Sequence, residues 1–521
     1  MSNTITEVRL LSVPLENDYM HSLYFDSVSD QITYFSGKTV KTGEDFSYQR
    51  KDKVIRYPLH VDSLLGINYV MYKNSAYSSK WFYAFITKIE YVNDGLTNIY
   101  IETDAIQTWL FDYEVKASFI EREHVADDTA GLHTYPEGLE LGEYVCSGKL
   151  DDKVTDGFLI VIAATMDLAG AETENAEPEF ENVGGTSYGK TYSGVRYFAY
   201  STPATVDIVL ANVAKAGKSD GIVSMFMCPS DFLNITETGE ITSSRVDPYY
   251  WSGSSGTIAR PGTINGYSVK NQKLLTYPFN YLMMSNNSGN SAIYKYEQFN
   301  DPSNCDFSIY GTVTPGFSCR IMPRNYNGVE ENNEEGLNLG KYPICNWNTD
   351  TYTNWMTQNS VNIGTNLAAS GIGVVASIAT LDGEGVVSGL TGVANTLGQV
   401  HAHSLIPPQS EGNINSGDVT FASGNLRFSA YKMSIKAEYA RIIDGYFDMY
   451  GYKVNRVKVP EKNHRESYWF TKTIDVNIDG AIPMEDMQTI KDCYNKGITF
   501  WRRPEVIQDY SIYNPIVNGG E

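Results

Sequence analysis

Residues 81–102 read Trp-Phe-Tyr-Ala-Phe-Ile-Thr-Lys-Ile-Glu-Tyr-Val-Asn-Asp-Gly-Leu-Thr-Asn-Ile-Tyr-Ile-Glu, and this stretch decides the fold class. Its first twelve residues are rich in aromatic and β-branched side chains, which favour strands. Asn93-Asp94-Gly95 is a strong turn signal, and residues 98–102 then alternate between apolar and polar side chains. The stretch therefore predicts an antiparallel hairpin.

The same patterns continue along the chain. We expect short strands at 8–14, 31–35, 158–163, 222–227, 452–459, 469–478 and 498–501. We expect helices at 203–216, at 435–447 and at 484–495. The second helix places Ile435, Tyr439, Ile442, Ile443, Tyr446 and Phe447 on one face before Gly451, and the third lies between Pro483 and Gly497. The prediction is an α+β fold that is mainly β.

Charge argues against stable nucleic-acid binding. The chain has 40 Lys and Arg against 62 Asp and Glu, a formal charge of −22. Proteins that hold phosphates need clustered cations, whereas an acidic conduit would let DNA slide past without sticking. At 521 residues the chain is long enough for several domains.

Cysteine and histidine spacing predicts no metal site and no cofactor. The six cysteines form no C-x-x-C pair, and we interpret them as mostly reduced core residues. A disulfide among Cys305, Cys319 and Cys345 stays open as an alternative. The polar N-terminus, Met1 to Val8, does not resemble a secretory signal.

One segment breaks the composition of the chain. Residues 363–400 contain 18 Ile, Leu, Val or Ala and eight Gly, with no aromatic residue and no Lys or Arg. Residues 363–381 are uncharged and would span roughly 28 Å as a helix, close to the thickness of a bilayer core. Asp382-Gly383-Glu384-Gly385 separates this arm from a second, shorter one, which suggests a hairpin with an acidic tip.

We predict that this segment plugs a channel or contacts a membrane. Its small-xxx-small spacings allow close packing, and the missing aromatic and basic anchors argue against a permanent transmembrane span. A buried helical hairpin and a flexible linker remain alternatives. The predicted membrane-interacting or plugging residues are Ile363, Leu367, Ile372, Val374, Val375, Ile378, Leu381, Val386, Val387, Leu390, Val393 and Leu397.

No motif predicts a catalytic residue. Gly184-Gly-Thr-Ser-Tyr-Gly-Lys-Thr191 matches the P-loop string and contains G-x-S-x-G, but a polar loop precedes it and no helix follows. We therefore interpret it as a chance match. His401 and His403 could bind a metal, although a solvated loop pair is the simpler interpretation. Glu121-Arg-Glu-His124 is interpreted as a cluster of surface or interface salt bridges.

Two groups of motifs resemble a known family. The first comprises 80–90, Ile106-Gln-Thr-Trp-Leu-Phe-Asp112 and Ser118-Phe-Ile-Glu-Arg-Glu-His-Val125. The second comprises Ile435-Lys-Ala-Glu-Tyr439, Tyr450-Gly-Tyr-Lys-Val-Asn-Arg-Val-Lys458 and Asn495-Lys-Gly-Ile-Thr-Phe-Trp501. These strings resemble the tail-knob, or distal tail-tube, proteins of small short-tailed phages of Gram-positive hosts. The likeness covers roughly the first 125 and the last 90 residues well, and the middle only in outline.

The resemblance implies a non-enzymatic homohexamer at the distal end of the virion tail. It implies β-barrel-like tube domains that assemble as a ring around passing double-stranded DNA, and an apolar loop that closes the exit and enters the host membrane. The upper tail tube or lower collar protein would be a further partner. A cell-wall hydrolase or a receptor-binding adhesin is the alternative.

We expect four regions on this basis. They are a β-rich tube wall formed by 1–125 with 420–521, an α+β insert at 126–260, a loop-rich β segment at 261–362 and the apolar loop at 363–408.

Overall fold

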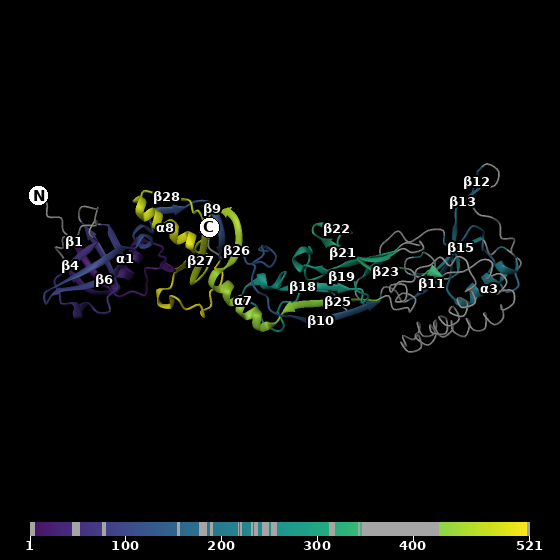
Figure 1. Cartoon of the computed structure of the whole chain (residues 1–521), viewed down its shortest axis with the longest axis horizontal. Helices are drawn as coiled ribbons and strands as arrows, with labels where there is room; N and C mark the ends of the chain where they lie inside the picture. Colours follow the sequence, from purple (N-terminus) through teal and green to yellow (C-terminus); the bar gives the residue numbers. More distant parts are fainter. Residues whose placement is uncertain are drawn as a thin grey trace, which may run out of the picture. The chain divides into compact units, whose positions relative to one another are not determined.

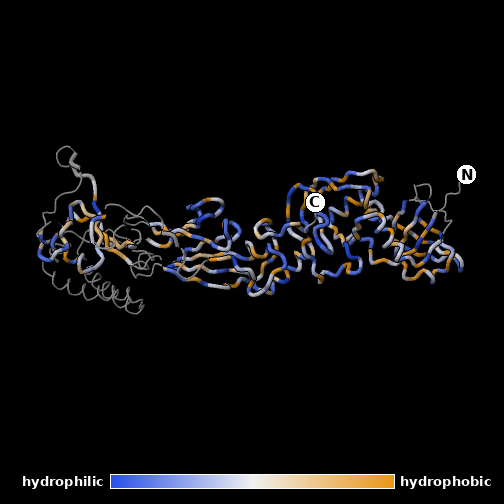
Figure 2. Tube along the Cα trace, turned by 180° about the vertical axis from the view of Figure 1, so that it is seen from behind, coloured by the Kyte–Doolittle hydropathy of each residue, from blue (hydrophilic) through white to orange (hydrophobic). Residues whose placement is uncertain are grey.

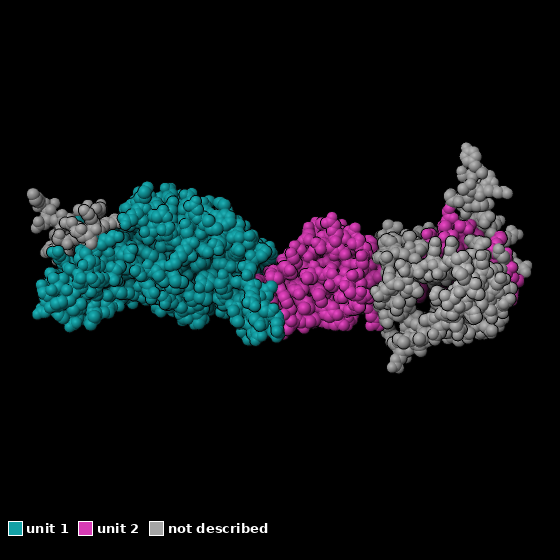
Figure 3. Space-filling model, in the orientation of Figure 1, with its two compact units in different colours: residues 1–143, 266–275, 436–521 teal, residues 144–265, 276–435 magenta. Residues whose placement is uncertain are grey.

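The structure is a computed structural model that describes most of the chain outside residues 346–426. The described residues are 6–43, 53–74, 80–153, 157–176, 185–187, 191–216, 218, 221–230, 233, 238–241, 249–251, 258–311, 318–341, 344–345 and 427–517. They form two compact units, coloured separately in Figure 3. Unit 1 comprises residues 1–143, 266–275 and 436–521, and unit 2 comprises residues 144–265 and 276–435.

The first sheet of unit 1 has six antiparallel strands in the order β3-β1-β5-β6-β7-β4. They are β1 (Thr6–Leu11), β3 (Thr39–Gly43), β4 (Val54–Tyr57), β5 (Tyr69–Asn74), β6 (Trp81–Asn93) and β7 (Leu96–Thr103). The predicted hairpin is confirmed, because β6 pairs with β7 from Ala84 opposite Thr103 to Asn93 opposite Leu96.

Hydrophobic residues are frequent along the strands of this sheet (Figure 2), and their side chains belong to two separate core clusters. Val70, Phe82 and Ile99 belong to a core cluster on one face. Tyr69 and Phe85 belong to a cluster on the other face, together with Trp501 from the far end of the sequence. Adjacent residues of β5 and β6 thus enter different cores, which explains why residues 69–72 and 82–86 are apolar or aromatic without interruption.

The predicted strand at 31–35 is wrong, because these residues lie in helix α1 (Val28–Gly37). Ser27 caps the helix by accepting a hydrogen bond from the backbone N–H of Asp30 at 3.1 Å. Phe35 is buried in the second cluster, against Tyr69 and Tyr83. The cap and this tertiary contact outweigh the strand preference of Ile32-Thr-Tyr-Phe.

The second sheet of unit 1 joins the two ends of the chain in the order β2-β29-β27-β9-β26. Its strands are β2 (His21–Leu23), β9 (Ser118–Glu123), β26 (Tyr452–Lys458), β27 (Tyr468–Ile474) and β29 (Ile498–Trp501), and a small sheet pairs β8 (Tyr113–Val115) with β28 (Ile478–Gly480). The helices are α2 (Ala105–Trp109), α7 (Ala437–Tyr450) and α8 (Met484–Lys496), with 3-10 turns η1 (Val61–Leu64), η5 (Gln272–Leu275) and η7 (Pro504–Val506). Trp469, Ile490 and Phe500 pack together between α8 and the sheet.

Two predictions in this region need correction. The strand expected at 469–478 is divided into β27 and β28, because Asp475 takes a left-handed conformation with φ 53°. Helix α7 begins at Ala437, so Ile435 belongs to a strand, and Ile442 is 70% exposed. The buried face of α7 consists of Ala440, Ile443, Asp444 and Phe447.

Unit 2 contains three larger sheets around one shared core (Figure 1). The first has the order β10-β25-β18-β19, with β10 (Tyr144–Lys153), β18 (Asn280–Ser285), β19 (Ser291–Tyr294) and β25 (Arg427–Ile435). The second has β17 (Tyr249–Trp251), β20 (Phe307–Tyr310), β21 (Ser318–Tyr326), β22 (Val329–Glu331) and β23 (Leu337–Lys341), and the 3-10 turn η6 (Tyr296–Gln298) comes just before β20 in the sequence. The third has the order β16-β14-β11-β15-β24, with β11 (Phe158–Ala164), β14 (Arg196–Tyr200), β15 (Ile222–Pro229), β16 (Gly239–Glu240) and β24 (Ile344–Cys345). Helix α3 (Pro203–Lys215) packs on the third sheet through Val206 and Val209.

The fold is thus α+β and mainly β, as predicted. Within the described part of the chain, no helix has the length and apolarity to cross a membrane. Cys146, Cys228, Cys305, Cys319 and Cys493 are free thiols, and all but Cys146 are buried.

Gly451 provides a test of the fold where the two ends of the chain meet. It ends α7 at φ 63°, and a Cβ there would lie 2.1 Å from the carbonyl oxygen of Glu123. Gly451→Ala should therefore lower the free energy of unfolding by more than about 2 kcal/mol, measured by denaturant titration. Gly445→Ala is the matched control, because Gly445 lies in the same helix and a Cβ there would meet no atom within 4 Å. This substitution should stabilise the protein by up to about 1 kcal/mol. Equal effects would contradict this account of Gly451.

Candidate functional site

A polar cluster inside unit 1 fixes the short segment 266–275, which lies between two parts of unit 2 in the sequence. The carboxylate of Asp444, on α7, accepts hydrogen bonds from the Tyr267 hydroxyl at 2.9 Å and from the backbone N–H groups of Lys270 at 2.8 Å and Asn271 at 3.0 Å. The Asn271 side chain donates to the same carboxylate at 2.8 Å. We call Asp444 and these donors the crossover clamp.

One helical turn further, Asp448 extends the crossover clamp. It accepts from the Asn271 side chain at 2.9 Å and from the Lys270 ammonium at 2.6 Å. Asp444 is 1% exposed, so its charge is stabilised by these donors instead of by water. The Asp444 carboxylate on the buried face of α7 therefore binds and positions the backbone of residues 270 and 271.

A second set of charges lies beside the crossover clamp and is also buried. Glu137 receives the Arg122 guanidinium and the Lys273 ammonium, and the side chains of all three residues are less than 10% exposed. The ring of Tyr446 lies 4.8 Å from the Arg122 guanidinium. Burial lowers the pKa of Lys273, while Glu137 opposes that shift. This set joins β9, the loop after it, η5 and α7.

A third set surrounds the end of β26. Glu123, which is fully buried, pairs with Lys458 at 2.6 Å and accepts from the backbone N–H of Glu461 at 3.0 Å. Burial raises the pKa of Glu123, and Lys458 partly offsets this effect. The salt bridges predicted for Glu121-Arg-Glu-His124 are present, but its last three residues are buried within the chain, so a surface position is wrong for them. Their partners come from segments that no local pattern could indicate.

His124 is held as a neutral imidazole. Its Nδ1 accepts from the backbone N–H of Phe470 at 2.7 Å, and its Nε2 lies 2.9 Å from the carbonyl oxygen of Asp448, to which it can donate. Burial and the nearby Arg465 hold the pKa of His124 well below its usual range. Burial also lowers the pKa of His464 to about 4, against the opposing effect of Glu461.

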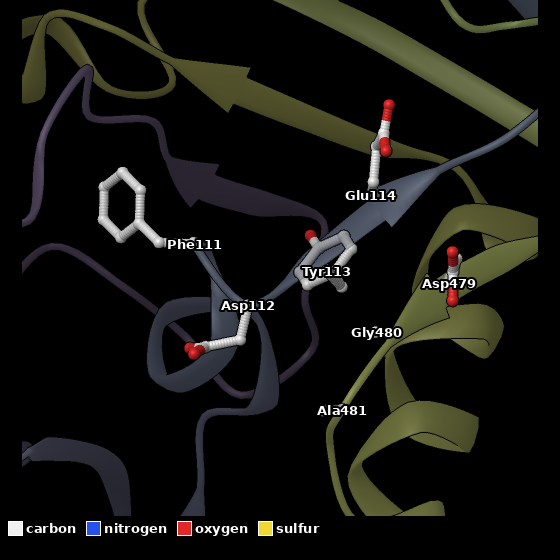
Figure 4. Close-up of a pocket in the computed structure, with 7 residues that line it drawn as sticks. All are labelled: Phe111, Asp112, Tyr113, Glu114, Asp479, Gly480 and Ala481. Atoms are coloured by element: carbon white, nitrogen blue, oxygen red, sulfur yellow. The ribbon is translucent and has the colours of Figure 1, made fainter.

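These groups do not form a catalytic arrangement. The carboxylates act as acceptors of backbone and cationic donors, and within the described residues no group of three or more His, Cys, Asp or Glu could hold a metal ion. A shallow depression of about 530 Å³ beside β8 is lined by Phe111, Asp112, Glu114 and Asp479, among others. In Figure 4, Asp112 points away from Glu114 and Asp479, which are opposite residues of the paired strands β8 and β28.

The predicted functional residues from Ile363 to Leu397, including the tip from Asp382 to Gly385, lie outside the described residues. His401 and His403 do so as well. The P-loop-like string contributes to a hairpin of β12 (Gly185–Ser187) and β13 (Thr191–Ser193), which differs from the strand, loop and helix that phosphate binding needs. The interpretation of that string as a chance match is therefore confirmed.

Fold and site together define a β-rich structural protein. The buried charged groups of unit 1 bind backbone N–H groups and cationic side chains and so fix the segments that meet there. Two family models match the sequence. The C-terminal domain of the tail knob protein gp9 of Bacillus phage phi29 matches residues 249–515, just over half of the chain, and the N-terminus of the caudoviral major tail protein matches residues 4–114. The chain belongs to the family of phage tail knob proteins.

Curated relatives and a solved structure agree with this assignment. The chain is 26% identical to the tail knob protein gp9 of Bacillus phage B103 and 25% identical to that of Bacillus phage phi29, with 98% of both chains covered in each case. Its fold is similar to the tail knob protein gp12 of bacteriophage C1, with a TM-score of 0.61 and 13% identity, over 98% of this chain and 100% of the other. The protein is a structural component of the virion tail tip, and it is not an enzyme. The alternative of a cell-wall hydrolase is therefore wrong.

The crossover clamp predicts a large effect for a nearly isosteric change. Asp444→Asn replaces one acceptor oxygen by an NH₂ group that faces donors, so the free energy of unfolding should fall by about 3 kcal/mol in a denaturant titration. Lys270→Ala is the matched control, because it removes only a half-exposed ammonium and keeps the backbone N–H that Asp444 binds. It should cost less than about 1 kcal/mol. Similar losses for both variants would show that the buried acceptor has no special role.

The buried histidines predict acid sensitivity. The pKa of His464 falls from 6.5 in the unfolded chain to about 4 in the fold, so below pH 6.5 the unfolded chain takes up the proton first. Stability should fall as the pH drops from 6.5 to about 4, by roughly 3 kcal/mol from this residue. Melting temperatures across this range measure the effect, and His464→Leu should flatten the curve. An unchanged curve in the variant would refute this role for His464.

Proposed function

We propose that six copies of this chain form a ring at the distal end of the tail, which conducts double-stranded DNA and is closed by the apolar segment 363–400 until the tail meets a host membrane. The single observation that carries the proposal is the abrupt change of composition at this segment within a tail knob protein. The upper tail tube or lower collar protein would bind the other end of the ring.

The charge of the chain suits a conduit. Each copy has a formal charge of −22, and six copies around one passage would repel the phosphates of DNA at every point along it. A surface that binds DNA would instead release counterions through clustered cations and would slow its passage. Passage without binding is therefore the expected behaviour.

The composition of the segment suits a plug that can open. Small residues let arms from several copies pack closely, which would fill the exit of the ring. The lack of aromatic and basic anchors makes a single hairpin a poor permanent span. Six hairpins held together could instead enter lipid as a group once they are released.

The acidic tip opposes insertion. Asp382 and Glu384 are the only charged residues between 363 and 400, and each carboxylate costs roughly 3 kcal/mol at the centre of a bilayer. We infer that the tip delays entry of the loop or crosses to the far interface. Neutralising it should therefore ease insertion.

Dye release from liposomes tests this function with the full chain. Replacing Leu367, Ile372, Val374, Val375, Ile378 and Leu381 together by Ser should reduce release at least tenfold, because the arm then loses its apolar surface. The double variant Asp382→Asn, Glu384→Gln alters the same loop but should increase release at pH 7.

Electron microscopy of each protein is the control, and it should show the same ring with a central channel. A stable monomer would contradict the conduit, and would leave the adhesin as the better hypothesis. A ring that never releases dye would contradict only the membrane role.

A further inference from the structure

One face of the second sheet of unit 1 exposes a row of apolar side chains. β27, β9 and β26 lie side by side in this sheet (Figure 1). Phe119 of β9 is opposite Val457 of β26 on one side and opposite Ile474 of β27 on the other. These side chains are 36%, 67% and 54% exposed, in that order. Directly opposite residues of paired strands lie about 5 Å apart, so the three form one continuous patch, which we call the apolar row.

The apolar row faces away from the core of unit 1. The neighbours of Phe119 in β9, Ser118 and Ile120, are both buried, as the alternation of side chains along a strand requires. Contiguous apolar patches are uncommon on the surface of proteins that act alone, and they usually mark a place where another molecule binds. The row therefore marks a surface for contact with another protein.

The apolar row continues into the depression beside β8. Residues 116 and 117 join β8 to β9, and residues 475–477 join β27 to β28. These two linkers are themselves paired, because the backbone N–H of Lys116 donates to the carbonyl oxygen of Asn477 at 2.9 Å. The depression measures about 530 Å³, and Phe111 in its lining is 40% exposed. The row and the depression thus lie along one ribbon of strands.

The depression is acidic. Glu114 and Asp479 are exposed and directly opposite each other in β8 and β28, while Val115 and Ile478 beside them are buried in the core. Like charges in such a pair destabilise each other. Lys116 pairs with Glu114, whose carboxylate, and to a smaller extent that of Asp479, raises the pKa of Lys116. One ammonium group therefore serves two carboxylates.

The end of the apolar row is acidic as well. Asp475, next to the row, is exposed and makes no ion pair with any residue that the structure describes. Lys472, the cation of β27, already pairs with Glu121 at 2.8 Å. Arg456 of β26 is opposite the buried Ile120, so it projects from the other face of the sheet. Negative charge on this surface is thus only partly compensated.

We propose that this surface of unit 1 receives a segment of a different tail protein, one that carries apolar side chains next to Lys or Arg. Its apolar side chains cover the apolar row, and its basic side chains lie beside Asp475 and Asp479. A basic partner suits the surface better than a second copy of this chain, because each copy has a formal charge of −22. The inference needs only the place of the chain in the tail, and it is independent of the ring and of the membrane role.

Photo-crosslinking in assembled virions tests the partner. The photoreactive amino acid p-benzoylphenylalanine replaces Val457 in the full-length chain, virions are purified and irradiated, and cross-linked peptides are identified by mass spectrometry. Position 457 should join to a peptide of another tail protein that contains Lys or Arg next to apolar residues. The same amino acid in place of Val40, which is 52% exposed in β3 of the same unit, is the matched control and should not join to that peptide.

Three results would overturn the proposal. A cross-link that forms only with another copy of this chain would assign the surface to contacts between copies. A cross-link to an acidic segment of another protein would refute the role of charge. Virions that contain the photoreactive chain but show no cross-link at position 457 would show that the surface stays free.

A change of charge gives an independent readout. Asp479→Lys combined with Asp475→Asn should reduce incorporation of the protein into virions at least tenfold, because the surface then repels a basic partner. Asn is used at 475 because it tolerates the left-handed backbone there, with φ 53°. Glu16→Lys combined with Asp18→Asn changes the net charge equally at other exposed positions of unit 1, and incorporation should stay unchanged.

Melting temperature and light scattering of both purified double variants separate this contact from folding and from self-assembly. Both variants should match the original protein in these measurements. Equal incorporation of the two variants into virions would count against the proposal. Loss of self-assembly in the variant at 475 and 479 alone would show that a second copy occupies the surface.

Discussion

The carboxylate of Asp444 satisfies four donors at once, and the arrangement of unit 1 depends on it. Three of these donors belong to residues 270 and 271, in the middle of a ten-residue segment whose neighbours on both sides lie in unit 2. So short a segment cannot supply a core of its own. Buried backbone groups need partners, and a charged acceptor on a helix provides the strongest ones.

The buried charges next to Asp444 follow the same logic. Arg122 and Lys273 share Glu137, and Lys458 compensates Glu123, so each ion that is removed from water finds an opposite charge nearby. Such pairs add less to stability than apolar packing of the same volume would, but each fails badly if one member is lost. Their main effect is therefore to specify which segments pair with each other. Their contribution to the stability of the fold is smaller.

Several signals that act within a few residues predict the structure correctly, whereas contacts between distant segments cannot be predicted from local patterns. Asn93-Asp94-Gly95 fixes the β6–β7 hairpin, and Pro483 with Gly497 bounds α8, because each signal acts within a few residues. The predicted buried face of α7 is wrong: Asp444 is buried and Ile442 is exposed, because the helix is oriented by a segment more than 170 residues away. The burial of Glu123 depends on Lys458 in the same way, so no pattern around residue 123 could reveal it.

The order of the strands in the second sheet of unit 1 also affects how the protein is made. β9 is flanked by β26 and β27, and β2 pairs with β29, so β2 and β9 cannot join this sheet until residues from 452 onward are available. Contacts at such sequence separation form slowly, and in a nascent chain this sheet would stay incomplete until translation is nearly finished. Because a truncated chain lacks the C-terminal strands, it cannot complete this sheet. Such a product would therefore seldom be incorporated into a particle.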